Sequence, residues 1–148
     1  MSFRVTRTGR ASWQGTVADG GGRLTVGSGA FEGPYSLRTR VEHDVAATNP
    51  EELLGAAEAA CFTMSLANTL SELGHPPHDL QTTARVTLEQ VGEQFNITRI
   101  ELVAVGEVPG IDQERFAAVA QQAKDCTVSR ALTGTQITLD ARLGDAGG

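Results

Sequence analysis

The sequence is poor in the features that mark nucleic-acid-binding and membrane-spanning proteins. It has one Trp and one Tyr, and its formal net charge is −6. It therefore offers neither a basic stripe nor an aromatic platform, and we expect no nucleic-acid partner. About 18 uninterrupted apolar residues occur nowhere, and the stretch MSFRVTRTGRASWQG has no signal-peptide core. We expect a soluble, cytoplasmic protein without a membrane partner.

Cysteine is also scarce, with only Cys61 and Cys126, 65 residues apart and without any C-x-x-C spacing. Intracellular thiols are normally kept reduced, so these two are expected to be reactive, metal-binding or inert rather than a structural disulfide. The two histidines of the segment HPPH (75–78) are interpreted as part of a solvated loop. We predict no metal and no cofactor.

The order of the expected elements predicts an α+β fold. The length suits a single domain over residues 1–148. Alternating runs predict three strands in the first part of the chain, at 13–17, 23–26 and 36–41. They also predict a hairpin of 83–91 and 95–105, with a bulge near 98–99, and a last strand at 136–143. Two main helices are expected, at about 48–73 and after Asp112. Because the parallel βαβ rhythm is absent, we expect antiparallel sheets.

The first helix has the clearest local signals. Capping side chains, a proline and two acids follow one another in TNPEE (48–52), and GHPP (74–77) ends the helix. Its alanines would allow close approach of another backbone. Its predicted apolar stripe consists of Leu53, Ala57, Ala60, Met64, Ala67 and Leu70.

Neither cysteine is assigned a role by its local sequence alone. A cysteine among alanines in a helix, such as Cys61, is most often a small buried hydrophobe. For Cys126, a cap from Asp125 on the turn 127–129 would place the thiol at a helix N-terminus, where a thiolate is favoured.

The wider stretches carry a family resemblance. The segments TNPEELLGAAEAACF and PYSLRTRVE, together with the pattern VPGID…F…AK…C.VS…L…ITLD, closely resemble the osmotically inducible protein C (OsmC) family, a relative of the organic hydroperoxide resistance (Ohr) proteins. The resemblance runs from about Trp13 to Leu143. It implies an OsmC-like fold, an intertwined homodimer with active sites at the subunit interface, and a cysteine-based peroxidase acting on organic hydroperoxides.

The resemblance also implies roles for particular residues. Cys61 matches the peroxidatic cysteine and Cys126 the resolving cysteine. Arg40 matches the arginine of the site, with neighbouring Arg38 as the fallback, and Glu51 matches the carboxylate that orients that arginine. The implied reductant is a dithiol of the lipoyl type. A further hypothesis is a dry apolar pocket for a hydrocarbon tail, lined by Leu54, Phe62, Met64 and residues of the partner chain.

Two positions depart from the family pattern. Glu58 stands where many relatives have a histidine, and a carboxylate facing the site would oppose thiolate formation, so we predict a surface or interface acid. Thr127 stands where proline usually follows the second cysteine, and we expect a looser turn there.

Two alternatives to a peroxidase remain open. Cysteine hydrolysis or acyl transfer would need a histidine base near Cys61, and no motif places His43, His75 or His78 there. A non-enzymatic, stress-induced redox-sensing or binding dimer would use a reversible disulfide equally well.

Overall fold

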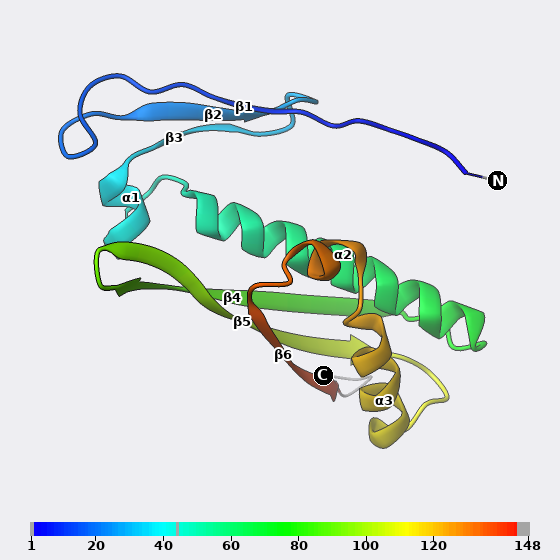
Figure 1. Ribbon diagram of the computed structural model, residues 1–148. Helices are drawn as coiled ribbons and strands as arrows, with labels where there is room; N and C mark the ends of the chain where they lie inside the picture. Colours follow the sequence, from blue (N-terminus) through cyan, green and yellow to red (C-terminus); the bar gives the residue numbers. More distant parts are fainter. Residues whose placement is uncertain (1, 44, 145–148) are drawn as a thin grey trace. The chain divides into compact units, whose positions relative to one another are not determined.

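The computed structural model describes residues 2–43 and 45–144 (Figure 1). The chain forms two compact units, residues 1–50 and residues 51–148. The organisation as one domain over 1–148 stays a prediction.

The first unit contains a small antiparallel sheet. Strands β1 (Gly9–Ala11), β2 (Gly22–Val26) and β3 (Glu32–Tyr35) pair in the order β1-β2-β3. The strand predicted at 23–26 is confirmed. The strand predicted at 13–17 is wrong, since only an isolated bridge between Gln14 and Gly21 forms there.

The strand predicted at 36–41 is also wrong, because Leu37–Val41 form a short helix, α1. Ser36 and Thr39 form a capping box, in which each side chain bonds to the backbone N–H of the other. This reciprocal pair satisfies two donors at the helix start and outweighs the alternation of Leu37, Thr39 and Val41 with arginines.

The second unit is built on a three-stranded sheet with the order β4-β5-β6. Its strands are β4 (Asp79–Val91), β5 (Gln94–Glu107) and β6 (Gln136–Leu143). Thr87 pairs with Arg99 but Leu88 pairs with Ile97, so the bulge predicted near 98–99 is confirmed. Helix α2 (Pro50–Glu72) matches the first predicted helix, and α3 (Gln113–Ala123) begins after its predicted cap, Asp112.

The α+β class is confirmed, but one strand pairing differs from the antiparallel prediction. β6 runs parallel to β5, with Ile100 opposite Ile137 and Leu102 opposite Leu139. The chain therefore crosses over between these strands through α3 and the short helix α4 (Thr127–Ala131). This crossover is the βαβ connection that the sequence interpretation had excluded.

One face of this sheet carries the core of the unit. Along β5, Ile100, Leu102 and Ala104 are buried, whereas the residues between them are not. The core also takes Phe62, Leu66 and Leu70 of α2, and Phe116, Val119, Ala120 and Ala123 of α3. Both long helices thus cover the same face of the sheet.

Helix α2 approaches the sheet closely at Gly55. A Cβ atom there would lie 3.1 Å from Val86 Cγ2 and 3.4 Å from the Ala84 carbonyl oxygen. Farther along α2, Thr63 Oγ1 donates a hydrogen bond at 2.7 Å to Thr82 Oγ1 of β4. Residues 55–63 of α2 are therefore held firmly against β4.

The predicted apolar stripe of α2 is wrong for Ala57, Ala60 and Met64, whereas Leu70 is buried and Leu53 and Ala67 are half-buried. Met64 is 74% exposed, and Ala57 and Ala60 are also exposed. α2 is apolar nearly all round, and by length and composition it could even cross a membrane, as core helices often can. The sheet takes the face with the largest apolar side chains, because these remove the most apolar area from water.

Candidate active site

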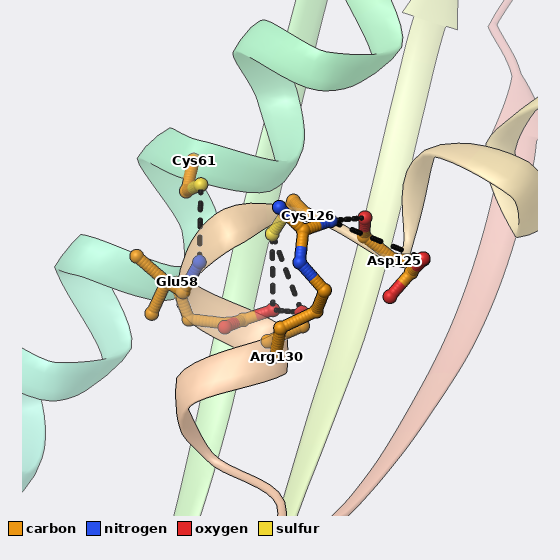
Figure 2. A network of polar contacts seen from close by, with 7 residues as sticks. Glu58, Cys61, Asp125, Cys126 and Arg130 are labelled. Atoms are coloured by element: carbon orange, nitrogen blue, oxygen red, sulfur yellow. Dashed lines mark hydrogen bonds and ion pairs between the residues drawn. The ribbon is translucent and has the colours of Figure 1, made fainter. Parts of the chain in front are cut away.

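The two cysteines meet although they lie far apart in the sequence. Cys61 is on α2, and Cys126 is the N-cap residue of α4. The Val128 N–H, in the first turn of α4, donates a hydrogen bond to Cys61 Sγ at 3.5 Å (Figure 2). The Cys61 thiol is also close enough to Cys126 to raise the pKa of the Cys126 thiol. The crossover through α3 and α4 therefore brings the two cysteine side chains close together.

The two thiols differ in their access to solvent. Both cysteines are free, Cys61 is half-buried, and Cys126 is only 4% exposed. A small molecule from solution thus reaches Cys61 more readily than Cys126.

The environment of Cys126 keeps it protonated. Burial raises the pKa of this thiol, and the hydrogen bond with Cys61 and the negative charge of Glu58 raise it further, against hydrogen bonds from Ser129 that lower it. The prediction that the start of a helix favours a thiolate at Cys126 is therefore wrong. Desolvation disfavours the thiolate, and this effect outweighs the stabilisation of a thiolate by the N-terminus of the short helix that follows.

Asp125 does not cap this helix. Cys126 itself occupies the cap position, without a side-chain cap hydrogen bond. Arg130 Nη1 donates to the Asp125 carbonyl oxygen at 2.9 Å and lies 3.9 Å from its carboxylate. The Cys126 carbonyl accepts from the Arg130 N–H at 3.0 Å. The turn after Cys126 is thus closed with Thr127 as the first helical residue.

Glu58 is the largest departure from expectation in this region. Its exposed fraction within the single chain is 0%, so the prediction of a surface or interface acid is wrong. Glu58 Oε1 accepts a short hydrogen bond from Ser129 Oγ and lies 3.9 Å from Cys126 Sγ (Figure 2). Ser129 had not been identified from the sequence at all. The sequence indicated the burial of Glu58 only indirectly, because Glu58 shares a helix face with Phe62 and Leu66, at spacings of four and eight residues.

The predicted arginine lies in the first unit, on α1. Arg40 lines a pocket of about 230 Å³ together with Trp13, Tyr35 and Leu37. The fallback arginine, Arg38, is largely exposed and pairs with Glu42 at 2.7 Å. The assignment of Arg40, with Arg38 as the fallback, stays a prediction.

Glu51 lies in the first turn of α2 and is 7% exposed. It precedes Cys61 by ten residues, which corresponds to roughly 15 Å along a helix axis. Glu51 therefore does not touch the Cys61 sulfur, and its expected action is through another group. Its pairing with Arg40 stays a prediction.

Among the apolar neighbours proposed for a substrate tail, Phe62 lies wholly inside the core. Leu54 is half-buried and Met64 is exposed. Only the latter two remain accessible for such a role.

Within residues 2–43 and 45–144, no group of three or more His, Cys, Asp and Glu side chains could hold a metal ion. In the HPPH segment, His75 Nδ1 instead lies 3.3 Å from the Pro109 carbonyl oxygen.

Comparison with known proteins places this arrangement in a family context. Residues 42–141 match the model of OsmC-like proteins. The chain is 43% identical over 141 residues to Peroxiredoxin OsmC of Escherichia coli, covering 94% of this chain and 97% of that protein.

Solved structures share the fold. An organic hydroperoxide resistance protein from Elizabethkingia anophelis superposes with a TM-score of 0.75 at 23% identity, covering 97% of this chain and 100% of that one. OhrB of Bacillus subtilis gives a TM-score of 0.72 at 24% identity, covering 91% and 98%.

Proposed function

Because the chain belongs to the OsmC-like protein family, we propose that it is a thiol-dependent peroxidase that reduces organic hydroperoxides to alcohols. The observation that carries the proposal is the proximity of an accessible thiol, Cys61, to a shielded one, Cys126, with the Val128 N–H of the turn after Cys126 bonded to the Cys61 sulfur. A relative named as a peroxiredoxin, with 43% identity over nearly the whole chain, supports the same reaction class.

The proposed cycle begins at Cys61. Its thiolate attacks the distal oxygen of the hydroperoxide, the O–O bond breaks, and the alkoxide leaves as an alcohol after taking up a proton. The Cys61 sulfenic acid then condenses with Cys126, forming a disulfide and releasing water. A dithiol reductant, which we expect to be of the lipoyl type, restores both thiols. The half-buried sulfur suits the first role, and the buried sulfur suits the second.

Ionisation of Cys61 supplies only part of the rate. A free cysteine with a pKa of about 8.5 is already a few per cent thiolate at neutral pH, so full ionisation gains little more than ~30-fold. In our proposal Arg40 also donates hydrogen bonds to the peroxide oxygens, a contribution of about 2.7–4 kcal/mol per well-placed donor. Glu51 holds the guanidinium fork in position.

The surroundings of Arg40 favour an organic substrate. The aromatic rings of Trp13 and Tyr35 and the side chain of Leu37 line the same pocket as Arg40. Each methylene buried there contributes about 0.8 kcal/mol to binding, an attraction that hydrogen peroxide lacks. We therefore expect preference for alkyl or aryl hydroperoxides.

The homodimer and the cytoplasmic location belong to the same proposal. Met64, Ala57 and Ala60 give α2 an exposed apolar face with small side chains. Such a face is suited to close helix packing, and a second copy of this chain is the partner that the family resemblance implies.

Steady-state turnover tests the proposal against a purely redox-sensing or binding role. With cumene hydroperoxide and a small dithiol, we expect wild type to turn over continuously and faster than with hydrogen peroxide. Cys126→Ser should consume one equivalent per chain and then stop or require excess dithiol, because its sulfenic acid has no partner thiol. Consumption by wild type of only one equivalent despite excess dithiol would instead indicate a sensor.

A further inference from the structure

Glu58 is a buried carboxylate that the proposed cycle leaves without a role. It is completely buried, and its Oε2 atom has no hydrogen-bond partner among residues 2–43 and 45–144. Burying a charged group with an unsatisfied oxygen costs free energy, so such groups call for an explanation in native structures. The cost is explained if the carboxylate takes part in chemistry.

The contacts of Glu58 converge on one sulfur atom. Cys126 Sγ lies 3.9 Å from Glu58 Oε1 and 3.3 Å from Ser129 Oγ, and the Ser129 hydroxyl donates to the same Oε1. The Cys126 sulfur, the Glu58 carboxylate and the Ser129 hydroxyl are therefore joined pairwise, as the dashed lines of Figure 2 mark. Cys61 follows Glu58 by three residues, so both side chains lie on neighbouring positions of one helix face.

The resolving step requires a base at this point. Burial raises the pKa of Cys126, so the thiol is protonated at neutral pH. A thiol attacks a sulfenic acid as its thiolate, and the proton must therefore leave the sulfur during the reaction. Cys126 is shielded from solvent, which leaves Glu58 as the anionic group in contact with it.

We propose that Glu58 is the general base of disulfide formation, taking the proton of Cys126 as this sulfur attacks the sulfenic acid of Cys61. The inference rests on the proposed peroxidase function, because the sulfenic acid is its intermediate. Ser129 acts as a positioning residue that holds Oε1 toward the thiol.

The step balances without a further reactant. The Cys126 thiol proton moves to Glu58, and the electron pair left on Cys126 Sγ forms the S–S bond. The S–O bond of the Cys61 sulfenic acid breaks, and the leaving hydroxide takes a proton from Glu58 to become water. Cys126 is oxidised, the sulfenic sulfur is reduced, and Glu58 returns to the carboxylate.

Glu58→Gln tests this role, because it keeps the shape of the side chain but removes the base. Reduced protein is mixed with one equivalent of cumene hydroperoxide, quenched at intervals, and weighed by intact mass spectrometry, which separates sulfenic acid from disulfide. We expect disulfide closure to slow by about 10²-fold. Sulfenic acid should accumulate in this variant and react with dimedone.

Two variants serve as controls for Glu58→Gln. Glu72→Gln changes an exposed acid on the same helix and should close at the wild-type rate. Glu58→Asp retains a carboxylate, and its disulfide should close at least about tenfold faster than that of Glu58→Gln. A purely structural role of Glu58 would not depend on the charge. Closure of folded Glu58→Gln at the wild-type rate, or of Glu58→Asp no faster than Glu58→Gln, would overturn the proposal.

A further variant covers the case in which Glu58→Gln does not fold. Ser129→Ala leaves the carboxylate in place but removes the hydroxyl that orients it, and we expect slower disulfide closure with accumulation of the sulfenic acid. In that case, closure of Ser129→Ala at the wild-type rate would overturn the inference. Failure of wild type to consume cumene hydroperoxide would instead contradict the proposed function, and hydrogen peroxide would then be used to start the closure step.

Discussion

Cys61→Ser is expected to abolish hydroperoxide reduction, lowering the rate by on the order of 10⁴-fold or more, as loss of a nucleophile does in other enzymes. A serine hydroxyl is far less ionised than a thiol and has no adjacent base assigned to it. Steady-state consumption of cumene hydroperoxide with a dithiol measures this directly. Circular dichroism should show an unchanged fold, because serine is close to cysteine in size and the position is half-buried.

The matched control for Cys61→Ser is Cys126→Ser. It removes the other thiol but should keep the first reduction event, because the peroxide reacts only at Cys61. Turnover retained by Cys61→Ser would show that Cys61 is not the peroxidatic cysteine. Loss of the first reduction event in Cys126→Ser would indicate that the peroxide reacts at Cys126 instead.

Arg40→Met is expected to lower the rate of the first step by about 10²–10³-fold, the usual effect of losing one donor to developing oxyanion charge. Methionine keeps much of the apolar stem of the side chain, so the change concerns mainly the guanidinium. The measurement is the second-order rate constant for hydroperoxide consumption under single-turnover conditions.

Arg38→Met provides a comparison two residues away on the same short helix. Arg38 is largely exposed and bonds to Glu42, and exposed pairs of this kind contribute little. We expect a rate close to wild type. A large loss in Arg38→Met with a normal rate in Arg40→Met would transfer the role to the fallback arginine.

Local signals were sufficient to predict several elements. The stacked start signals at 48–52 placed the beginning of α2, and Asp112 marked the start of α3, where it accepts from the Arg115 N–H at 2.7 Å. Alternation over Gln136–Leu143 gave β6 with its observed bounds. These features depend on neighbours in sequence, so a pattern of a few residues determines them.

Features that depend on distant parts of the chain were not predictable in the same way. The alternating pattern of β6 predicts a strand but not its direction relative to β5, because that direction depends on the crossover through α3 and α4. Likewise, α2 has apolar residues on several sides, and only the sheet determines that Phe62 and Leu66 face inward. The choice of face also decides whether Glu58 is buried.

The candidate site was predicted as two cysteines but not as a network. The resemblance to OsmC proteins identified Cys61 and Cys126, and the structure brings Cys61 to the turn that follows Cys126. Ser129 and the burial of Glu58 escaped prediction because both follow from the docking of α4 against α2. A protonated Cys126 follows from the same docking, since burial raises the pKa of its thiol.

Stoichiometric oxidation of the wild-type protein tests the central claim most directly. Reduced protein is treated with one equivalent of cumene hydroperoxide, digested without reductant, and analysed by mass spectrometry. The account predicts a disulfide joining Cys61 to Cys126 within one chain, with one molecule of cumyl alcohol released per chain. Free Cys126 after the peroxide is consumed, or disulfides only between chains, would contradict it.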